Sequence, residues 1–400
     1  MKAKGTIIGI LFLLISGWVQ AQGTFVIEGQ VKNVKQGVCL NLFQMENGVG
    51  DIIAVDTLQG ETFRFELPVS SDDGMKRMLL MIQDNDLYNM GLDLWVKNGS
   101  HIRLTGEDMN IYTWQVESDI PTQKIWQLFV DDSRELWDLY QVNFLEQMRH
   151  NHWCFKVNPT GQEKVRAIAI LDSLEKIGDD LRVRISANEI ERMKQLPVEE
   201  VWMDKLRSLA VGVKYSKDFP YRKEVEQLYN RLSDEQRQTP EALDIQTLLA
   251  PPETVSLQEN AADGDLFDLQ GGVHHLSDFK GKSVLIDFWS RGCGPCVMAL
   301  PEMEEINKEY QDRLVLVSLS IEDKTGWEIA SRHHKISWWN LNDLKGQHGI
   351  YAKYTSGTIP RYVFLSPEGE VVEMWSGYGK GSLKLKMQQL LDTEKKGEKL

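Results

Sequence analysis

The chain is poor in cysteine: it has only four, Cys39, Cys154, Cys293 and Cys296, in 400 residues. So few thiols exclude a small secreted scaffold held together by several disulfides. Cys39 and Cys154 lie far apart, in segments of different character, so we expect each to be a buried, small apolar side chain. A disulfide between them is the alternative. The other two are separated by two residues and form a candidate reactive pair.

Positive charge is also scarce, because 45 Lys and Arg residues stand against 59 Asp and Glu and give a formal net charge of −14. A nucleic-acid-binding protein needs a basic surface to neutralise phosphates, so this balance argues against a nucleic-acid partner. With 42% hydrophobic and 26% charged residues, the composition is that of a soluble globular protein. A length of 400 residues predicts two or three domains.

Long hydrophobic runs are missing except at the N-terminus. Lys2 and Lys4 precede an apolar segment over residues 7–19, and small side chains stand at the positions that determine cleavage after Ala21. This pattern predicts a cleavable signal peptide over residues 1–21 and export to the periplasm. The alternative is a retained transmembrane anchor, although the run is short for a bilayer. No cysteine follows it, which argues against a lipid anchor.

The cysteine pair follows an apolar run, residues 284–289, that is typical of a central strand buried on both faces. A helical pattern begins at the cysteines, so the pair lies at a helix N-terminus, and Pro295 suits a first helical turn. Free backbone N–H groups and the helix dipole stabilise an anion there. We therefore expect Cys293 to attack as a thiolate and Cys296, one turn later, to resolve the mixed disulfide.

Two other interpretations of the pair stay open. A zinc site would need a second pair of ligands at suitable spacing, which the sequence does not offer. His150, His152 and Cys154 form a compact cluster, but this also lacks a partner half, so we predict no metal ion and no cofactor. The second alternative is a structural disulfide in a non-enzymatic envelope binding protein.

The motif Cys-Gly-Pro-Cys at residues 293–296, on a strand-to-helix turn, resembles the active site of the thioredoxin superfamily, in particular of TlpA-like and ResA-like thiol-disulfide oxidoreductases. The resemblance implies that Asp287 is the buried carboxylate that takes the proton of the resolving thiol. It also implies that Pro301 kinks the active-site helix.

The same resemblance implies a substrate-binding surface. Thr358, Ile359 and Pro360 match the family's cis-proline loop, which faces the dithiol and pairs its backbone with the substrate like an added strand. Gly294 and Pro295, between the cysteines, complete the implied surface.

Three positions depart from the family's pattern. Gly292 stands where thioredoxins usually have a tryptophan, which opens the rim of the site. Ala299 stands where ResA-like proteins usually have a glutamate, which weakens cytochrome c maturation as the specific task. Val297 replaces a commonly basic residue and leaves Arg291 as the nearest cation able to favour the thiolate.

The expected function is that of an exported thiol-disulfide oxidoreductase, which reduces protein or small-molecule disulfides through a mixed disulfide. A Gly-Pro dipeptide between the cysteines resembles reducing thioredoxins, and a periplasmic dithiol oxidase is the alternative. The implied partners are the disulfide substrates and a membrane-derived electron donor or acceptor.

Three parts of the chain precede a polar tail at residues 394–400. Residues 22–115 are strand-rich with regular turns, which predicts an antiparallel β-sandwich. This part resembles the β-rich domain of unassigned function, DUF4369, that precedes many exported TlpA-like thioredoxins. Residues 116–250 change to a helical period, with Trp137, Tyr140 and Phe144 on one core-facing side. This connecting region could also form the interface of a homodimer.

Residues 251–393 carry the thioredoxin resemblance. An N-terminal hairpin, the active-site strand and helix, a second buried strand at 314–321, a strand pair at 362–365 and 371–375, and a closing helix at 383–391 follow in order. The expected fold is a mixed sheet flanked by helices, an α/β thioredoxin-like fold. The pairs at 274–275 and 333–334, all histidine, are expected at the surface.

Overall fold

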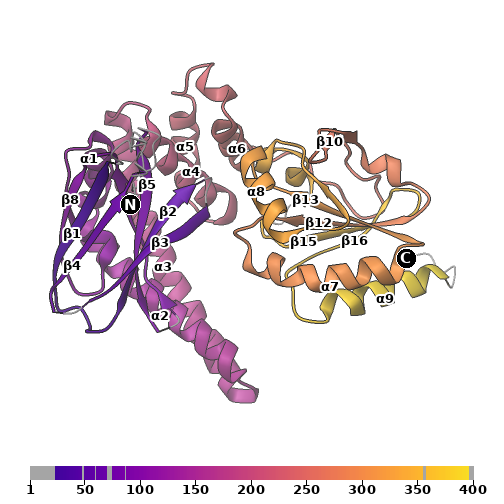
Figure 1. Cartoon of the computed structure of the whole chain (residues 1–400), viewed down its shortest axis with the longest axis horizontal. Helices are drawn as coiled ribbons and strands as arrows, with labels where there is room; N and C mark the ends of the chain where they lie inside the picture. Colours follow the sequence, from indigo (N-terminus) through magenta and orange to yellow (C-terminus); the bar gives the residue numbers. More distant parts are fainter. Residues whose placement is uncertain are drawn as a thin grey trace, which may run out of the picture.

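The computed structural model describes residues 23–46, 49–58, 60–69, 74–85, 87–354 and 357–395, so the predicted signal peptide lies outside the described residues. Figure 1 shows two bodies: a first one of strands and helices, and a second one in which a sheet is flanked by helices. A search of the described ranges finds no helix with the length and apolarity needed to cross a membrane.

The N-terminal part contains two sheets. One has the strand order β4-β1-β8-β9 and the other the order β3-β2-β5-β6, with β7 also paired to β5. Phe25, Ile27, Gly29 and Val31 of β1 are buried at a spacing of two, as expected for a strand with one covered face. The bounds are β1 Thr24–Lys32, β2 Cys39–Glu46, β3 Val49–Thr57, β4 Thr62–Pro68, β5 Lys76–Asp84, β6 Leu87–Tyr88, β7 Leu92–Val96, β8 His101–Glu107 and β9 Gln115–Glu117.

Two features of these sheets differ from the sequence prediction. β1 and β8 run parallel, with Ile27 opposite Ile102, so the arrangement is not antiparallel throughout. β5 is not among the predicted strands, although it lies between β2 and β7 in the second sheet. Its buried residues do alternate, but Leu79 and Met81 between them are also apolar, which hides the period of two.

Helices follow the sheets and share their core. The buried residues of both form one continuous cluster, which includes Trp95 of β7, Trp126 of α1 and Trp202 of α4. The predicted division near residue 115 therefore does not separate two hydrophobic cores. The bounds are α1 Pro121–Asp131, α2 Arg134–Val157, α3 Gly161–Gln195, α4 Glu200–Tyr215, α5 Arg222–Tyr229 and α6 Pro240–Leu249.

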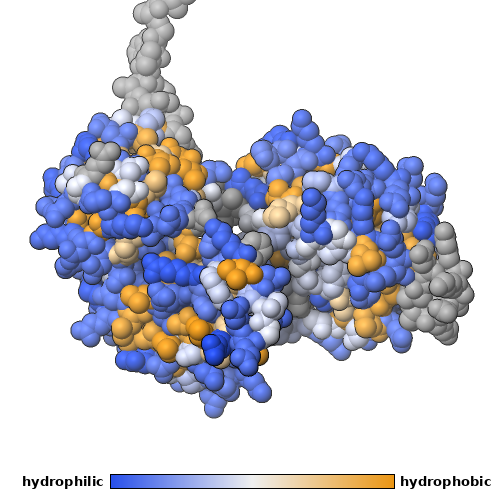
Figure 2. Space-filling view, turned by 90° about the horizontal axis from the view of Figure 1, so that it is seen from below, coloured by the Kyte–Doolittle hydropathy of each residue, from blue (hydrophilic) through white to orange (hydrophobic). Residues whose placement is uncertain are grey.

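The far ends of α2 and α3 project from the first body as an arm (Figure 1). Trp137 at the base of the arm is buried, as predicted, but Tyr140 and Phe144 are half-buried. Two helices that pack only on each other leave much apolar surface in contact with water. Figure 2, seen from below, accordingly shows hydrophobic patches on a mostly hydrophilic surface. Exposed large apolar residues of the two helices are Leu139, Val142, Trp153, Val157, Val165, Ile168, Ile170 and Ile177.

The second body is the predicted thioredoxin-like fold. Its sheet has the order β14-β13-β12-β15-β16. Strands β12, β13 and β14 run parallel, β15 pairs antiparallel with β12, and β16 pairs antiparallel with β15. Helices α7 and α9 pack together over one face (Figure 1). The bounds are β10 Leu266–Phe267, β11 Val273–His274, β12 Ser283–Trp289, α7 Gly294–Tyr310, β13 Leu314–Ser320, α8 Lys324–His334, β14 Trp339–Leu341, β15 Arg361–Leu365, β16 Val371–Ser376 and α9 Ser382–Lys395.

The two bodies meet where α6 packs on the short 3-10 helix η4, Gly346–His348. The ring of His348 hydrogen-bonds through Nδ1 to Asp244 Oδ1 of α6 at 2.8 Å. The connecting segment then runs along the second body, since Val255 N–H donates to Lys353 O at 2.9 Å and Gln258 N–H to Val371 O at 2.7 Å. Residues from 255 onward therefore belong to the second body.

Candidate active site

The site lies where β12 ends and α7 begins. All seven residues of β12 are buried, so the strand forms a rigid base for the turn that follows. Cys293 is the N-cap of α7, and Pro295 stands in its first turn, where no intrahelical N–H is needed. The sequence prediction for this strand, turn and helix is confirmed.

Cys293 and Cys296 are joined by a disulfide, with their Cα atoms 5.2 Å apart. Both cysteines are buried, but Cys293 keeps 8% of its surface exposed and Cys296 only 1%, so Cys293 is the more accessible of the two to an incoming thiolate. The Cys296 N–H points at Cys293 Sγ, with an N–S distance of 3.2 Å. A backbone donor so placed stabilises negative charge on Cys293.

An accessible rim surrounds the first sulfur. Gly292, Gly294, Pro295 and Met298 are exposed on the N-terminal side of α7, and Met298 is 67% exposed. Gly292 has no side chain that could cover the disulfide. The rim is uncharged and apolar, which suits contact with an extended polypeptide.

The Thr-Ile-Pro segment lies beside the cysteines. The Ile359–Pro360 peptide bond is cis, and Ile359 packs against a cluster formed by Trp289, Cys293, Cys296 and Ala330. Thr358 is exposed and Pro360 is buried. Strand β15, which begins at the next residue, pairs with β12 and thereby fixes this loop next to the active-site turn.

Asp287 lies under the start of α7. Residues 285, 287 and 289 of β12 face the same side of the sheet, because side chains alternate along a strand. On that side, Leu285 packs with Ala299 of α7, and Trp289 packs with both cysteines. Asp287 is thus enclosed between the sheet and the active-site helix, with 1% of its surface exposed.

The surroundings of Asp287 favour its protonated form. Burial raises its pKa to about 7, against a weaker opposite effect of the hydrogen bond from Ser318 Oγ to Oδ2 at 3.2 Å. Trp338 Nε1–H in turn donates to Ser318 Oγ at 2.9 Å. Asp287 Oδ1 has no hydrogen-bond partner among the described residues. A carboxyl in this setting can accept or release a proton near neutral pH.

Tyr362 lies next to Asp287 across the β12–β15 ladder. Its hydroxyl is buried and, within the described ranges, lacks a hydrogen-bond partner. Burial, and then the negative charge of Asp287, raise the pKa of Tyr362 far above its usual value, so it stays neutral. Ser318, Trp338 and Tyr362 are absent from the sequence prediction. A signal for Ser318 exists, because it is a polar residue inside the otherwise apolar start of β13.

A second carboxyl stands behind the active-site turn. Glu322 Oε1 accepts the backbone N–H of Arg291 at 3.1 Å. Burial raises the pKa of Glu322, and the hydrogen bond and positive charge of Arg291 oppose that rise. Arg291, predicted to favour the Cys293 thiolate, is thus also engaged with Glu322, a half-buried acid that is absent from the sequence prediction.

The histidine pairs are only partly at the surface. His333 is exposed as expected, but the ring of His334 lies against Trp289, with centroids 5.9 Å apart. Burial, together with His333, lowers the pKa of His334, so it is neutral near the disulfide. His274 and His275 are both half-buried, and their rings hydrogen-bond to Asp268 and Asp265.

Other candidate groups are placed away from this site. Cys39 and Cys154 are free thiols, so the alternative prediction of a disulfide between them is wrong. Both are only half-buried, so the prediction that they are buried side chains is also wrong. His150 Nε2 contacts Ala167 O at 3.1 Å. In the part of the chain that the structure describes, no three His, Cys, Asp or Glu side chains are arranged to hold a metal ion.

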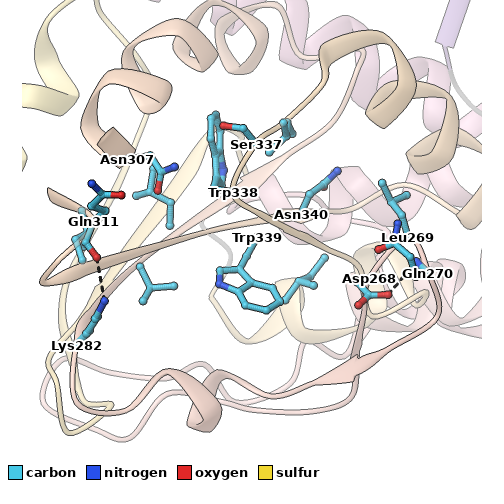
Figure 3. A pocket seen from close by; sticks show the side chains of 15 residues that line it. Asp268, Leu269, Gln270, Lys282, Asn307, Gln311, Ser337, Trp338, Trp339 and Asn340 are labelled. Atoms are coloured by element: carbon cyan, nitrogen blue, oxygen red, sulfur yellow. Dashed lines mark hydrogen bonds between the residues drawn. The ribbon is translucent and has the colours of Figure 1, made fainter. Parts of the chain in front are cut away.

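A cavity of about 560 Å³ lies beside β13 and β14 (Figure 3). Trp338 and Trp339 project into it, and its lining includes two hydrogen bonds, from Lys282 Nζ to Gln311 O at 2.9 Å and from Gln270 N–H to Asp268. Trp338 also donates to Ser318, so this cavity adjoins the Asp287 network.

The similarity to known proteins lies in the second body. Residues 257–374 match the AhpC/TSA family. A thioredoxin-like protein, YneN, from Bacillus subtilis (strain 168) is 32% identical over 146 residues, which are 35% of this chain and 82% of that protein. The thiol-disulfide oxidoreductase ResA from Geobacillus kaustophilus (strain HTA426) is 29% identical over 125 residues, 31% of this chain and 71% of that protein.

Similar solved structures also cover about one third of this chain. A putative thiol:disulfide interchange protein DsbE from Chlorobium tepidum has 26% identity and a TM-score of 0.32, covering 35% of this chain and 98% of that one. A putative thiol-disulfide oxidoreductase from Bacteroides vulgatus has 29% identity and a TM-score of 0.29, covering 33% of this chain and 88% of that one.

Proposed function

Because the chain belongs to the thioredoxin-like family of thiol-disulfide oxidoreductases, we propose that it reduces protein disulfides outside the cytoplasm through Cys293 and Cys296. The observation that carries this proposal is the disulfide at the N-terminus of α7, in which Cys293 is more exposed than Cys296.

The first step uses the reduced enzyme. The Cys293 thiolate attacks one sulfur of a substrate disulfide, the substrate S–S bond breaks, and a mixed disulfide forms between Cys293 and the substrate. The displaced substrate thiolate takes a proton from solvent. The N–H of Cys296 stabilises the attacking thiolate, as its 3.2 Å contact with Cys293 Sγ supports.

The second step releases the product. Cys296 passes its proton to the carboxylate of Asp287, and the resulting thiolate attacks Cys293 Sγ. The mixed disulfide breaks, the second substrate thiolate leaves and takes the proton that Asp287 holds, and the enzyme disulfide remains. The dithiol supplies the two electrons that the substrate gains, while one proton comes from solvent and the other from Cys296 through Asp287. The position of Asp287 on the side of β12 that faces α7 supports its role as proton acceptor.

The substrate is held by the loop around the cis peptide bond. The backbone of Thr358 and Ile359, with Pro360 behind it, pairs with an extended substrate, while Gly294 and Pro295 contact it from the helix. The packing of Ile359 against the cysteine cluster supports this role. The predicted signal peptide would bring the enzyme to the periplasm. There a membrane-derived electron donor would return the pair to the dithiol form. The N-terminal sheets would form a DUF4369-like domain.

Turnover of insulin with dithiothreitol as donor tests the proposal. We expect the full-length protein to accelerate reduction of the insulin disulfides and Cys293→Ser to abolish this. Absence of turnover by a folded wild-type protein would leave the disulfide a structural one. The direction is decided by the reduction potential of the pair: a value near that of thioredoxin, about −270 mV, supports a reductase, and one near −120 mV supports an oxidase.

A further inference from the structure

A second, smaller cavity lies between the two bodies, at the edge of the active site. Its volume is about 260 Å³. One wall comes from the helical region and includes Lys214 and Tyr215 at the end of α4 and Leu248 of α6. The other wall belongs to the thioredoxin-like fold and includes Gly357 and Ile359. This volume is smaller than that of sites for small molecules and cofactors, which is roughly 300 Å³ and more, and it suits a single side chain.

This cavity adjoins the disulfide through shared residues. Ile359 lines it and also packs against the cysteine cluster. Ser290, which lines it as well, immediately precedes the active-site turn, and its carbonyl accepts the N–H of Cys293 at 3.2 Å. A peptide whose cysteine reaches Cys293 along the Ile359 backbone therefore has a neighbouring side chain at the mouth of this cavity.

The helical region is held firmly against the loop. A Cβ added to Gly357 would lie 2.5 Å from Cε1 of Tyr215, so the tyrosine ring lies directly on the glycine backbone. Gly357 has a φ of 90°, which other L-residues rarely adopt. The hydrogen bond between His348 and Asp244 fixes the same junction from the other side.

The cavity lining contains one basic side chain, Lys214, and one acidic side chain, Asp244. Lys214 is half-buried in its wall, and its Nζ stands 5.3 Å from the centre of the Tyr215 ring. Burial lowers the pKa of Lys214. Asp244, the acidic residue of the lining, is already bonded to His348.

We infer that this cavity is a substrate subsite, in which Tyr215 and Lys214 of the helical region bind an acidic side chain next to the target cysteine of an extended peptide. The inference rests on the proposed function and gives the helical region a part in substrate selection. Tyr215 supplies the apolar wall, and Lys214 supplies the counter-charge for a Glu or Asp.

Single-turnover reduction of defined peptides tests the inference. Each peptide carries one cysteine as a mixed disulfide with 2-mercaptoethanol, with Glu, Gln or Lys on both sides of it. Bis(2-hydroxyethyl) disulfide, which has no side chains, is the reference substrate. The enzyme is the full-length protein, reduced and freed of reductant, and product thiol is measured after rapid acid quench.

We expect the wild type to reduce the Glu peptide at least about fivefold faster than the Lys peptide. Lys214→Gln should bring this ratio close to one, whereas Lys223→Gln, an exposed lysine of α5, should leave it unchanged. Tyr215→Ala should lower the rate for the Glu peptide about tenfold relative to the rate for the reference disulfide. Tyr215→Phe should retain most of the difference, because it keeps the ring.

Three results would overturn the inference. Equal rates for the Glu and Lys peptides in the wild type would exclude an acidic subsite. A preference for the Glu peptide that survives in Lys214→Gln would show that another residue supplies the positive charge. Faster reduction of every substrate by Tyr215→Ala would show that Tyr215 restricts access to Cys293 and does not bind the substrate. Failure of the wild type with the reference disulfide as well would instead refute the proposed function. Circular dichroism confirms that each variant is folded.

Discussion

Replacement of Asp287 by Asn should change how stability depends on pH. Burial raises the pKa of Asp287 from 3.8 to about 7, and each pKa unit corresponds to about 1.4 kcal/mol. Between these two pKa values the unfolded chain has released the proton and the native chain has kept it. The native state therefore loses stability as the pH rises through this window, by roughly 4 kcal/mol in all, and the loss is complete above pH 7.

Hydrogen exchange of the β12 amides in the oxidised protein measures this effect in the body that contains Asp287, independently of the N-terminal body. Between about pH 5 and pH 8, the wild-type strand should lose roughly 3 kcal/mol of opening free energy, or about a hundredfold in protection factor after correction for intrinsic exchange. Asp287→Asn should lack this loss and should be the more stable protein at pH 8, because it carries no buried charge.

The control is Asp312→Asn, which removes an exposed carboxylate in the turn between α7 and β13. It should follow the wild type at every pH. The reasoning is refuted if Asp287→Asn loses protection with rising pH as steeply as the wild type, since the carboxyl would then not be held in its protonated form. The same variant should slow release of product from the mixed disulfide about a hundredfold, which is the usual contribution of a general base.

Three further predictions concern the site and the scaffold. Cys296→Ser should accumulate the mixed disulfide with substrate, which non-reducing electrophoresis detects as a band that dithiothreitol removes; no such band would contradict Cys293 as the attacking residue. Ser318→Ala removes the hydrogen bond that lowers the pKa of Asp287 and should move the midpoint of its pH-dependent exchange above 7; an unchanged or lower midpoint would contradict the assigned contact. Gly29→Ala would place a Cβ 2.2 Å from Phe63 and should destabilise the first body by about 1–3 kcal/mol in urea unfolding, and an unaffected midpoint would show that Phe63 moves aside freely.

The sequence allows the active-site strand, turn and helix to be predicted because each depends on residues close together in the chain. An apolar run, two cysteines and a proline at a helix start define local structure without any distant partner. The cis-proline loop is predicted by resemblance, and its packing against the cysteines follows from the neighbouring strands β12 and β15.

The features that escape prediction depend on contacts between distant segments. Nothing near Ser318 in the sequence indicates that its hydroxyl meets Asp287, 31 residues away. The parallel pairing of β1 with β8 joins residues 26–32 to residues 101–107, which no local pattern specifies. Tyr215 lies at the end of a helix in another region, and its contact with Gly357 exists only because the two bodies meet.

The single core shared by the N-terminal sheets and the helices determines how the protein can be divided. A protease that cuts at residues 251–254 would sever the chain between the buried cluster that ends at Leu249 and the hydrogen bonds that begin at Val255. Two intact fragments should survive such a cut. A cut near residue 118 would instead split one hydrophobic interior in half, and both pieces should aggregate or be digested.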